Sequence, residues 1–208
     1  MKTSDEKSND GAMQELLASF SVRRSRRSLL KGAAIGGAAS MAAAVGAAGI
    51  LLPSKLAHAS GGEGAEVTMQ QIFDIAVTAE RLAVTTYSQG IAAADELGIS
   101  GNNLMYLKAA LVEEQIHELF FEAAGGKPLT STFSYPHGED TFDRLDLFIA
   151  TQQQLEGVFD SAFLAAVKEF ALMGQPRLAQ IAAQIACIES EHRALGRDIG
   201  GLVPADNW

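Results

Sequence analysis

Four long stretches of helical periodicity, with no convincing strand between them, constrain most strongly what this chain of 208 residues can fold into. Apolar residues recur at helical spacing over about residues 68–96, 102–124, 141–173 and 176–199. Glycine follows each stretch, as it commonly does after the last helical turn, and Pro176 stands where a first turn accepts proline. The sequence therefore predicts an all-α domain of four helices.

The links between these helices differ in length, and the difference predicts the topology. The first and third links have only a few residues, so the helices that they join must form antiparallel hairpins. The middle link, residues 125–140, can reach roughly 50 Å when extended, whereas a helix of twenty residues is about 30 Å long. We therefore expect a four-helix bundle of two antiparallel hairpins joined by a long crossover along its outside.

Charge is distributed unevenly along the chain. Residues 1–59 carry eight Lys or Arg and four Asp or Glu, a net charge of +4, and residues 60–208 carry eight basic and 21 acidic residues, a net charge of −13. So acidic a domain is a poor candidate for binding nucleic acid or anionic lipid, but it attracts cations. The single cysteine, Cys187, excludes an intramolecular disulfide, and we predict that it packs between helices.

The first 59 residues have the pattern of a targeting signal. A polar region ends in Arg26-Arg27, an uncharged Ala/Gly-rich run follows over residues 32–53, and Ala57-His58-Ala59 supplies the small residues expected before a cleavage site. The arginine pair with the following Leu29-Leu30-Lys31 resembles the twin-arginine export signal, in which phenylalanine is frequent at the position of Leu29. The resemblance implies export of a folded protein to the periplasm or the cell exterior.

A membrane anchor is the alternative interpretation of the same segment, because residues 32–53 are long enough to span a bilayer. Their low hydrophobicity argues against permanent anchoring. We therefore predict a twin-arginine-type signal peptide over residues 1–59, a flexible joint over residues 60–66 and a folded domain over residues 67–208.

Six side chains that commonly bind metals fall on otherwise apolar helix faces. Two helices each carry a Glu-x-x-His sequence, whose spacing of three residues places both side chains on one face. The other two helices each carry one glutamate at comparable depth. The six candidate ligands are Glu80, Glu114, His117, Glu156, Glu189 and His192.

Charge balance indicates what such a cluster would bind. Four buried carboxylates without partners are very costly, and no lysine or arginine lies on these faces. Two divalent ions would bring the charge to zero, and oxygen and imidazole donors without thiolate favour iron or manganese. We expect Glu114 and Glu189 to bridge the two ions, and Glu80 and Glu156 to bind one each.

One glutamate from each of two helices and Glu-x-x-His from each of the other two resembles the di-metal carboxylate bundles of the ferritin-like superfamily. More narrowly, residues 66–206 resemble bacterial exported ferritin-like proteins related to plant desiccation-associated proteins. The residues that carry this narrower resemblance are Glu80 with Tyr87, Gly125-Gly126-Lys127-Pro128, Leu155-Glu156, Glu189-Ser190-Glu191-His192-Arg193 and Pro204.

Several neighbours of the candidate ligands have open roles. Tyr87 either hydrogen-bonds a ligand or takes part in redox chemistry, or it is a core tyrosine with a satisfied hydroxyl, which we favour. Asp160 lies one turn beyond Glu156 and is able to replace or support it. We expect the remaining acids to be solvated: Glu113, Glu118 and Glu191.

Three functions follow from the resemblance and the ligand set. The first is a redox-active di-iron or di-manganese protein, an oxidase or peroxide scavenger acting in envelope stress protection. The second is non-catalytic metal sequestration or storage, and the third is a structural bundle that has lost its metal site. The expected partners are metal ions with oxygen or peroxide, and the membrane only through the export signal. The native metal, the substrate, the reductant and any homodimer stay open.

Overall fold

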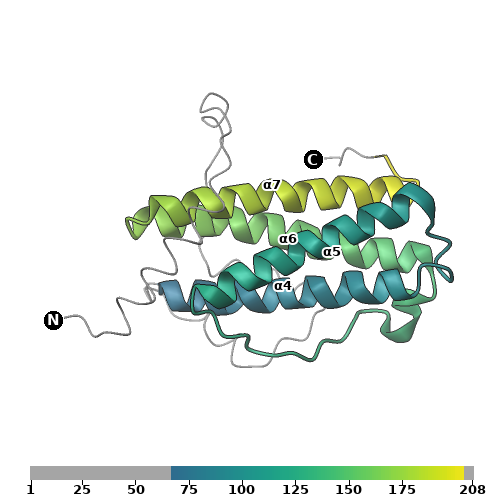
Figure 1. Ribbon diagram of the computed structural model, residues 1–208, viewed down its shortest axis with the longest axis horizontal. Coiled ribbons are helices and arrows are strands. Elements are labelled where there is room, and N and C mark those ends of the chain that lie inside the picture. The colour runs from purple at the N-terminus through teal and green to yellow at the C-terminus, as the bar shows by residue number, and fades with distance from the viewer. Residues whose placement is uncertain (1–66, 204–208) are drawn as a thin grey trace.

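Four α-helices and no strand form within residues 67–203, the part of the chain that the computed structural model describes (Figure 1). They are α4 (Met69–Ala92), α5 (Gly101–Ala123), α6 (Leu145–Leu172) and α7 (Pro176–Ile199). Helix α4 packs mainly against α5, and α6 packs mainly against α7. The helices of each pair run in opposite directions (Figure 1). The predicted all-α bundle of two antiparallel hairpins is thus confirmed, while the predicted signal peptide and joint lie outside the described residues.

Local sequence explains where the helices begin and end. Helix α4 starts after Thr68, which forms a capping box with Gln71. Helix α7 starts with Pro176 in its first turn, as predicted. Gly125 after α5 and Gly174 after α6 have φ values of 95° and 69°, a left-handed conformation that glycine adopts without steric cost.

Two predicted helix boundaries were wrong. The first helix ends at Ala92, not at residue 96, and turns continue the chain to Gly98, whose φ is 68°. The third helix begins at Leu145, not at residue 141. A short 3-10 helix, η1 (Gly138–Phe142), occupies the earlier positions, and the extended backbone of Arg144, with φ −135° and ψ 124°, separates it from α6.

The segment between α5 and η1 runs along the bundle beside α4, as predicted for the crossover (Figure 1). Successive residues of the segment contact successive residues of α4, so the two advance together for about four turns of helix. These contacts are Gly125 O with Gln70 Nε2 at 2.9 Å, Lys127 N with Asp74 Oδ1 at 2.7 Å, Leu129 N with Thr78 Oγ1 at 2.9 Å, and the Tyr135 and Thr86 hydroxyls at 3.1 Å.

Two hydrophobic clusters fill the bundle, one toward each end. One cluster packs Phe73, Phe121 and Phe170 with apolar residues of all four helices. The other, around Leu107 and Phe148, closes the opposite end. None of the described helices is both long enough and apolar enough to cross a membrane.

Candidate metal centre

The six candidate ligands lie in the bundle interior, between the two hydrophobic clusters, and all are buried. Their donor atoms form two groups, and within each group one donor atom per residue lies within 4.8 Å of the others. Two residues, Glu114 and Glu189, belong to both groups. The first group is Glu80, Glu114, His117 and Glu189, and the second is Glu114, Glu156, Glu189 and His192.

Each shared carboxylate divides its two oxygens between the two histidines. Glu114 Oε2 lies 3.5 Å from His117 Nδ1, and Oε1 of the same carboxylate lies 2.9 Å from His192 Nδ1. Glu189 Oε1 lies 3.5 Å from His117 Nδ1, and its Oε2 lies 3.5 Å from His192 Nδ1. Glu114 and Glu189 thus each offer one oxygen to each of the two groups of candidate ligands.

Most donor atoms of the cluster are buried without a hydrogen-bond partner among the described residues. Both oxygens of Glu80, Glu114 and Glu189, and Oε2 of Glu156, are in this condition, as is Nδ1 of each histidine. Buried polar groups are normally satisfied, and several unsatisfied carboxylates in one place are costly. The unsatisfied atoms face one another, so the residues fit a pair of cations bound between them.

The pKa values of the metal-free cluster show how its charge is balanced. Burial raises the pKa of Glu80 and of Glu156 well above the usual range, and neighbouring carboxylates add to the effect. Burial alone would lower the pKa of His117 and of His192, but the surrounding carboxylates outweigh it and raise both. Burial alone would likewise raise the pKa of Glu114, but the adjacent imidazoles hold it well below its usual range. These shifts favour charged imidazoles beside the Glu114 carboxylate, so protons on the histidines offset part of the negative charge of the cluster.

Two further side chains hold Glu156 in position. The Tyr87 hydroxyl donates a hydrogen bond to Glu156 Oε1, and burial together with the Glu156 charge raises the pKa of Tyr87, which keeps the hydroxyl protonated. Gln152 donates to the Tyr87 hydroxyl at 3.1 Å and to the His192 carbonyl at 2.9 Å. Tyr87 is therefore a buried tyrosine with a satisfied hydroxyl whose partner is a candidate ligand.

Glu113 supports a ligand that lies on another helix. Its Oε2 lies 2.9 Å from His192 Nε2, the ring nitrogen that faces away from the cluster. The prediction that Glu113 is merely solvated was wrong, although its side chain stays 43% exposed. A carboxylate on the outer nitrogen of a metal-binding histidine fixes the orientation of the ring. Among the described residues, nothing holds Nε2 of His117 in this way.

The remaining neighbours lie outside the cluster. Asp160 belongs to neither group of candidate ligands, and burial raises its pKa while a hydrogen bond with Ser190 lowers it. Glu118 pairs with Arg81 at 2.6 Å instead of being solvated, whereas Glu191 is exposed as predicted. Cys187 is exposed, so its predicted packing between helices was wrong.

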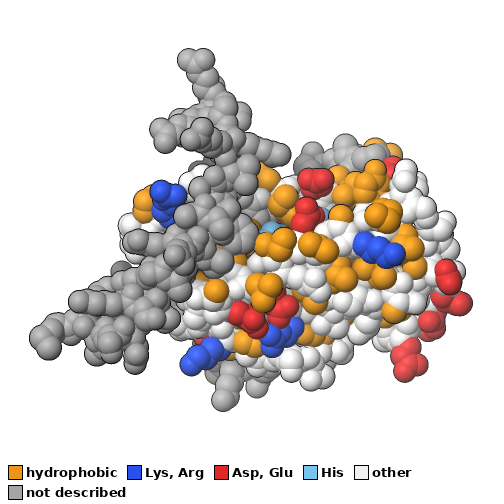
Figure 2. Space-filling view, viewed as in Figure 1, with side chains coloured by type: hydrophobic (Ala, Val, Ile, Leu, Met, Phe, Trp, Pro, Cys, Tyr) orange, Lys and Arg blue, Asp and Glu red, His pale blue; other side chains and the backbone are white. Residues whose placement is uncertain are grey.

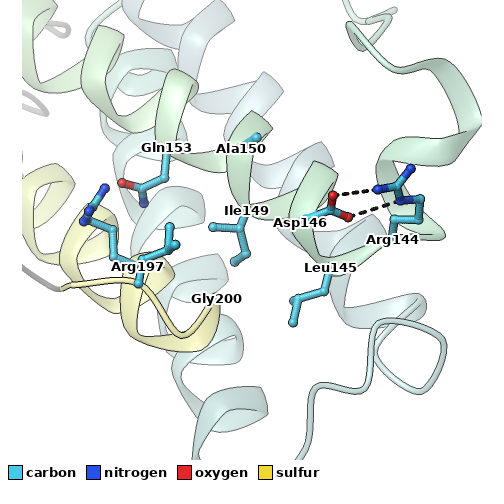
Figure 3. A pocket seen from close by; sticks show the side chains of 9 residues that line it. Arg144, Leu145, Asp146, Ile149, Ala150, Gln153, Arg197 and Gly200 are labelled. Carbon is cyan, nitrogen blue, oxygen red and sulfur yellow. Dashed lines mark hydrogen bonds and ion pairs between the residues drawn. The ribbon is translucent and has the colours of Figure 1, made fainter.

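A surface pocket of about 630 Å³ lies away from the cluster, where the start of α6 meets the end of α7 (Figure 3). Ile149, Gln153 and Arg197 line it, and Arg144 at its edge pairs with Asp146 at 2.7 Å. None of the six candidate ligands lines this pocket. It therefore offers no evidence on the chemistry of the buried cluster.

Comparison with models of known protein families identified a match. A family model described as a ferritin-like domain matches residues 68–201, which include all four helices and all six candidate ligands. Searches of the curated proteins and of the solved structures found no match.

Proposed function

Because this chain belongs to the ferritin-like domain family, we propose that its buried cluster binds two iron or manganese ions. Glu114 and Glu189 would contribute to both positions, Glu80 and His117 to one, and Glu156 and His192 to the other. The donors are oxygen and imidazole nitrogen, a set that suits these metals better than copper or structural zinc.

One observation carries the proposal. Glu114 and Glu189 are each fully buried, and each directs one oxygen toward each histidine without a hydrogen-bond partner for either oxygen. A carboxylate whose purpose is structural would receive hydrogen bonds in such an interior. Two divalent ions would neutralise the four glutamates of the cluster and would coordinate the oxygens that lack a hydrogen bond.

The proposed activity is redox chemistry with small oxidants. Iron or manganese held by these residues would supply electron exchange with dioxygen or peroxide, which are small enough to reach a buried site. The protein's own residues exclude bulk water, because hydrophobic clusters close both ends of the bundle. Tyr87 and Gln152 fix the Glu156 carboxylate, and Tyr87 holds a proton within hydrogen-bonding distance of it.

We place this activity outside the cytoplasm, in protection of the cell envelope, on the evidence of Arg26-Arg27 and the small residues before Ser60. Lysine in place of both arginines should stop export, and localisation of the variant tests this. Unchanged export of an intact, membrane-held chain would favour the anchor. The narrower kinship with plant desiccation-associated proteins belongs to the same proposal.

Metal stoichiometry tests the proposed site. Purified protein, stripped with a chelator and reloaded with Fe(II) or Mn(II), should hold about two ions per chain and unfold at a higher temperature than the stripped form, since ions that bind only the native state stabilise it. Glu114→Ala or Glu189→Ala should lose both ions, because a bridge serves both. Glu80→Ala should weaken mainly one, and Asp160→Ala, a carboxylate outside the cluster, should keep both.

The outcomes separate the three functional classes. Fewer than about one ion per chain, with no change in unfolding temperature on loading, would leave a structural bundle without a metal site. Two bound ions without turnover of oxygen or peroxide would indicate sequestration or storage. Two bound ions with turnover would support the oxidase or peroxide-scavenging activity.

A further inference from the structure

Helix α5 carries a second apolar face, which is exposed, whereas the face that bears Glu114 and His117 is buried. Large hydrophobic side chains are exposed along this face. The exposed fraction is 62% for Met105, 53% for Val112, 40% for Ile116 and 63% for Leu119, so these residues do not belong to the core. Ala109 and Ala123 are exposed on the same face. Figure 2 shows hydrophobic side chains along the side of the molecule on which α5 lies. We call this set the α5 stripe: Met105, Ala109, Val112, Ile116, Leu119 and Ala123.

The spacing of the α5 stripe is that of a coiled-coil seam. Its members alternate steps of four and three residues through the whole helix, which gives the mean repeat of 3.5 residues at which two helices pack along each other. The stripe is about 27 Å long, at 1.5 Å per residue. Scattered surface hydrophobic residues need no explanation, but a continuous seam of this length marks an interaction surface.

We propose that the α5 stripe binds the α5 stripe of a second copy of this chain, with the two helices antiparallel. In this pairing the seam is self-complementary, because Val112 packs against Ile116 of the second copy and Met105 packs against Ala123. The strongly acidic domains, which carry a net charge of −13 over residues 60–208, would repel each other over most surfaces. They meet here through uncharged side chains.

Charges beside the seam complement each other in the antiparallel direction. Lys108, which is exposed, flanks one end of the α5 stripe and would lie beside Glu122 of the second copy, whose carboxylate is 39% exposed and binds Arg81 of its own chain through Oε1. A parallel pairing would instead direct Lys108 to Glu113, whose Oε2 binds the imidazole of the candidate ligand His192. The two Glu113 side chains lie near the two-fold axis of the antiparallel pair, each turned toward its own histidine.

The mass of the full chain in solution tests the pairing. Light scattering during size-exclusion chromatography should give twice the mass of one chain, and Val112→Lys should give a monomer. Leu164→Lys is the matched control, because Leu164 is 58% exposed on α6, away from the stripe, and it should leave the dimer intact. Circular dichroism should report a folded protein for both variants, since neither side chain is part of the core.

Cross-linking tests the direction of the helices. In a Cys187→Ser background, Gln115→Cys should form a disulfide-linked dimer under mild oxidation, because the two exposed Gln115 side chains flank the two-fold axis of the antiparallel pair. Leu164→Cys should not. Lys108→Glu should weaken the dimer at least several-fold, and the double variant with Glu122→Lys should restore it.

Any of the following results would overturn the proposal. They are a full chain that is monomeric, a Val112→Lys variant as dimeric as the Leu164→Lys control, and cross-linking of Gln115→Cys no greater than that of Leu164→Cys. A chain that dimerises only after residues 1–59 are removed would also overturn it for the full chain, because that segment would then be the occupant of the stripe.

Discussion

At the residue scale, the two histidines of the cluster differ in whether a carboxylate supports the outer ring nitrogen. The outer nitrogen of His192 is bound by Glu113, whereas His117 has no such support among the described residues. Loss of a supporting carboxylate typically lowers metal affinity about 10- to 100-fold. We therefore expect Glu113→Ala to weaken the position formed by Glu156 and His192 by that factor, with a much smaller effect on the other position. Calorimetric titration of the metal-free protein with Mn(II) measures both affinities.

The matched control for this prediction is Glu191→Ala, which removes an exposed carboxylate that directly precedes His192 in the chain. It should leave both affinities unchanged. Glu113→Gln keeps an oxygen acceptor for the imidazole and should recover part of the lost affinity. Equal losses in Glu113→Ala and Glu191→Ala would show that only the overall negative charge matters and that Glu113 does not position the histidine.

Four of the six clustered side chains were predictable from spacing within single helices. A step of three residues from glutamate to histidine places both on a common face whatever the neighbouring helix does. Glu80 and Glu156 were predicted from their apolar helix faces and their comparable depth in the other two helices. The support of His192 by Glu113 was not predictable, because it depends on how far α5 lies from α7. Gln152 had a signal that sequence reasoning missed: it lies four residues before Glu156 and therefore on the same helix face.

At the element scale, the close approach of α6 and α7 connects helix packing to the cluster. Gly196 on α7 lies so near Gln152 that an added Cβ would overlap its side-chain amide, with the Nε2 atom 2.8 Å away. That amide cannot move aside freely, because it is buried and hydrogen-bonded to Tyr87 and to the His192 carbonyl. Gly196→Ala should therefore destabilise the protein by about 1–3 kcal/mol, as overpacking does.

Gly157 on α6 provides the comparison for Gly196. The nearest atoms to an added Cβ there belong to the Arg193 guanidinium, whose carbon would lie at 3.4 Å and whose nitrogens would lie at 3.6 and 3.7 Å, which are ordinary contact distances. Alanine favours helix over glycine by roughly 0.5–1 kcal/mol, so Gly157→Ala should be neutral or stabilising. Urea unfolding of both variants decides the matter, and a Gly196→Ala protein as stable as Gly157→Ala would refute the predicted overlap.

Helix pairing followed from link lengths, because a few residues cannot carry the chain from one end of a bundle to the other. The course of the long crossover beside α4 could not be read in the same way. It depends on Asp74 and Thr78, which accept backbone hydrogen bonds from the crossover, and on Thr86, whose hydroxyl lies 3.1 Å from that of Tyr135.

The boundary between η1 and α6 was missed because residues 138–142 adopt a tighter helix that shares much of the local pattern of an α-helix.

At the scale of the whole molecule, the buried cluster makes the stability of the metal-free protein depend on protons. Glu80, Glu156, His117 and His192 all have a raised pKa in the folded state, and each is fully solvated in the unfolded chain. The folded protein therefore binds more protons than the unfolded protein at pH values above the ordinary pKa of each group. By linkage, stability falls with increasing pH wherever the folded state holds the extra protons.

The dependence of folding stability on pH should change sign when metal is bound. Between about pH 5.5 and pH 8, the chelated protein should lose stability as the pH rises, because the unfolded chain releases its histidine protons near pH 6.5 while the folded cluster must keep them. Metal ions compete with the same protons, so the loaded protein should gain stability over the same range, and loading should release protons into the buffer. Thermal unfolding of both forms at a series of pH values, with a pH indicator during loading, measures these effects.

Parallel dependence of stability on pH for the two forms, or loading without proton release, would mean that the protons and the ions do not share one site. The four buried carboxylates would then have to be balanced by something other than the cluster's own histidines and the bound ions.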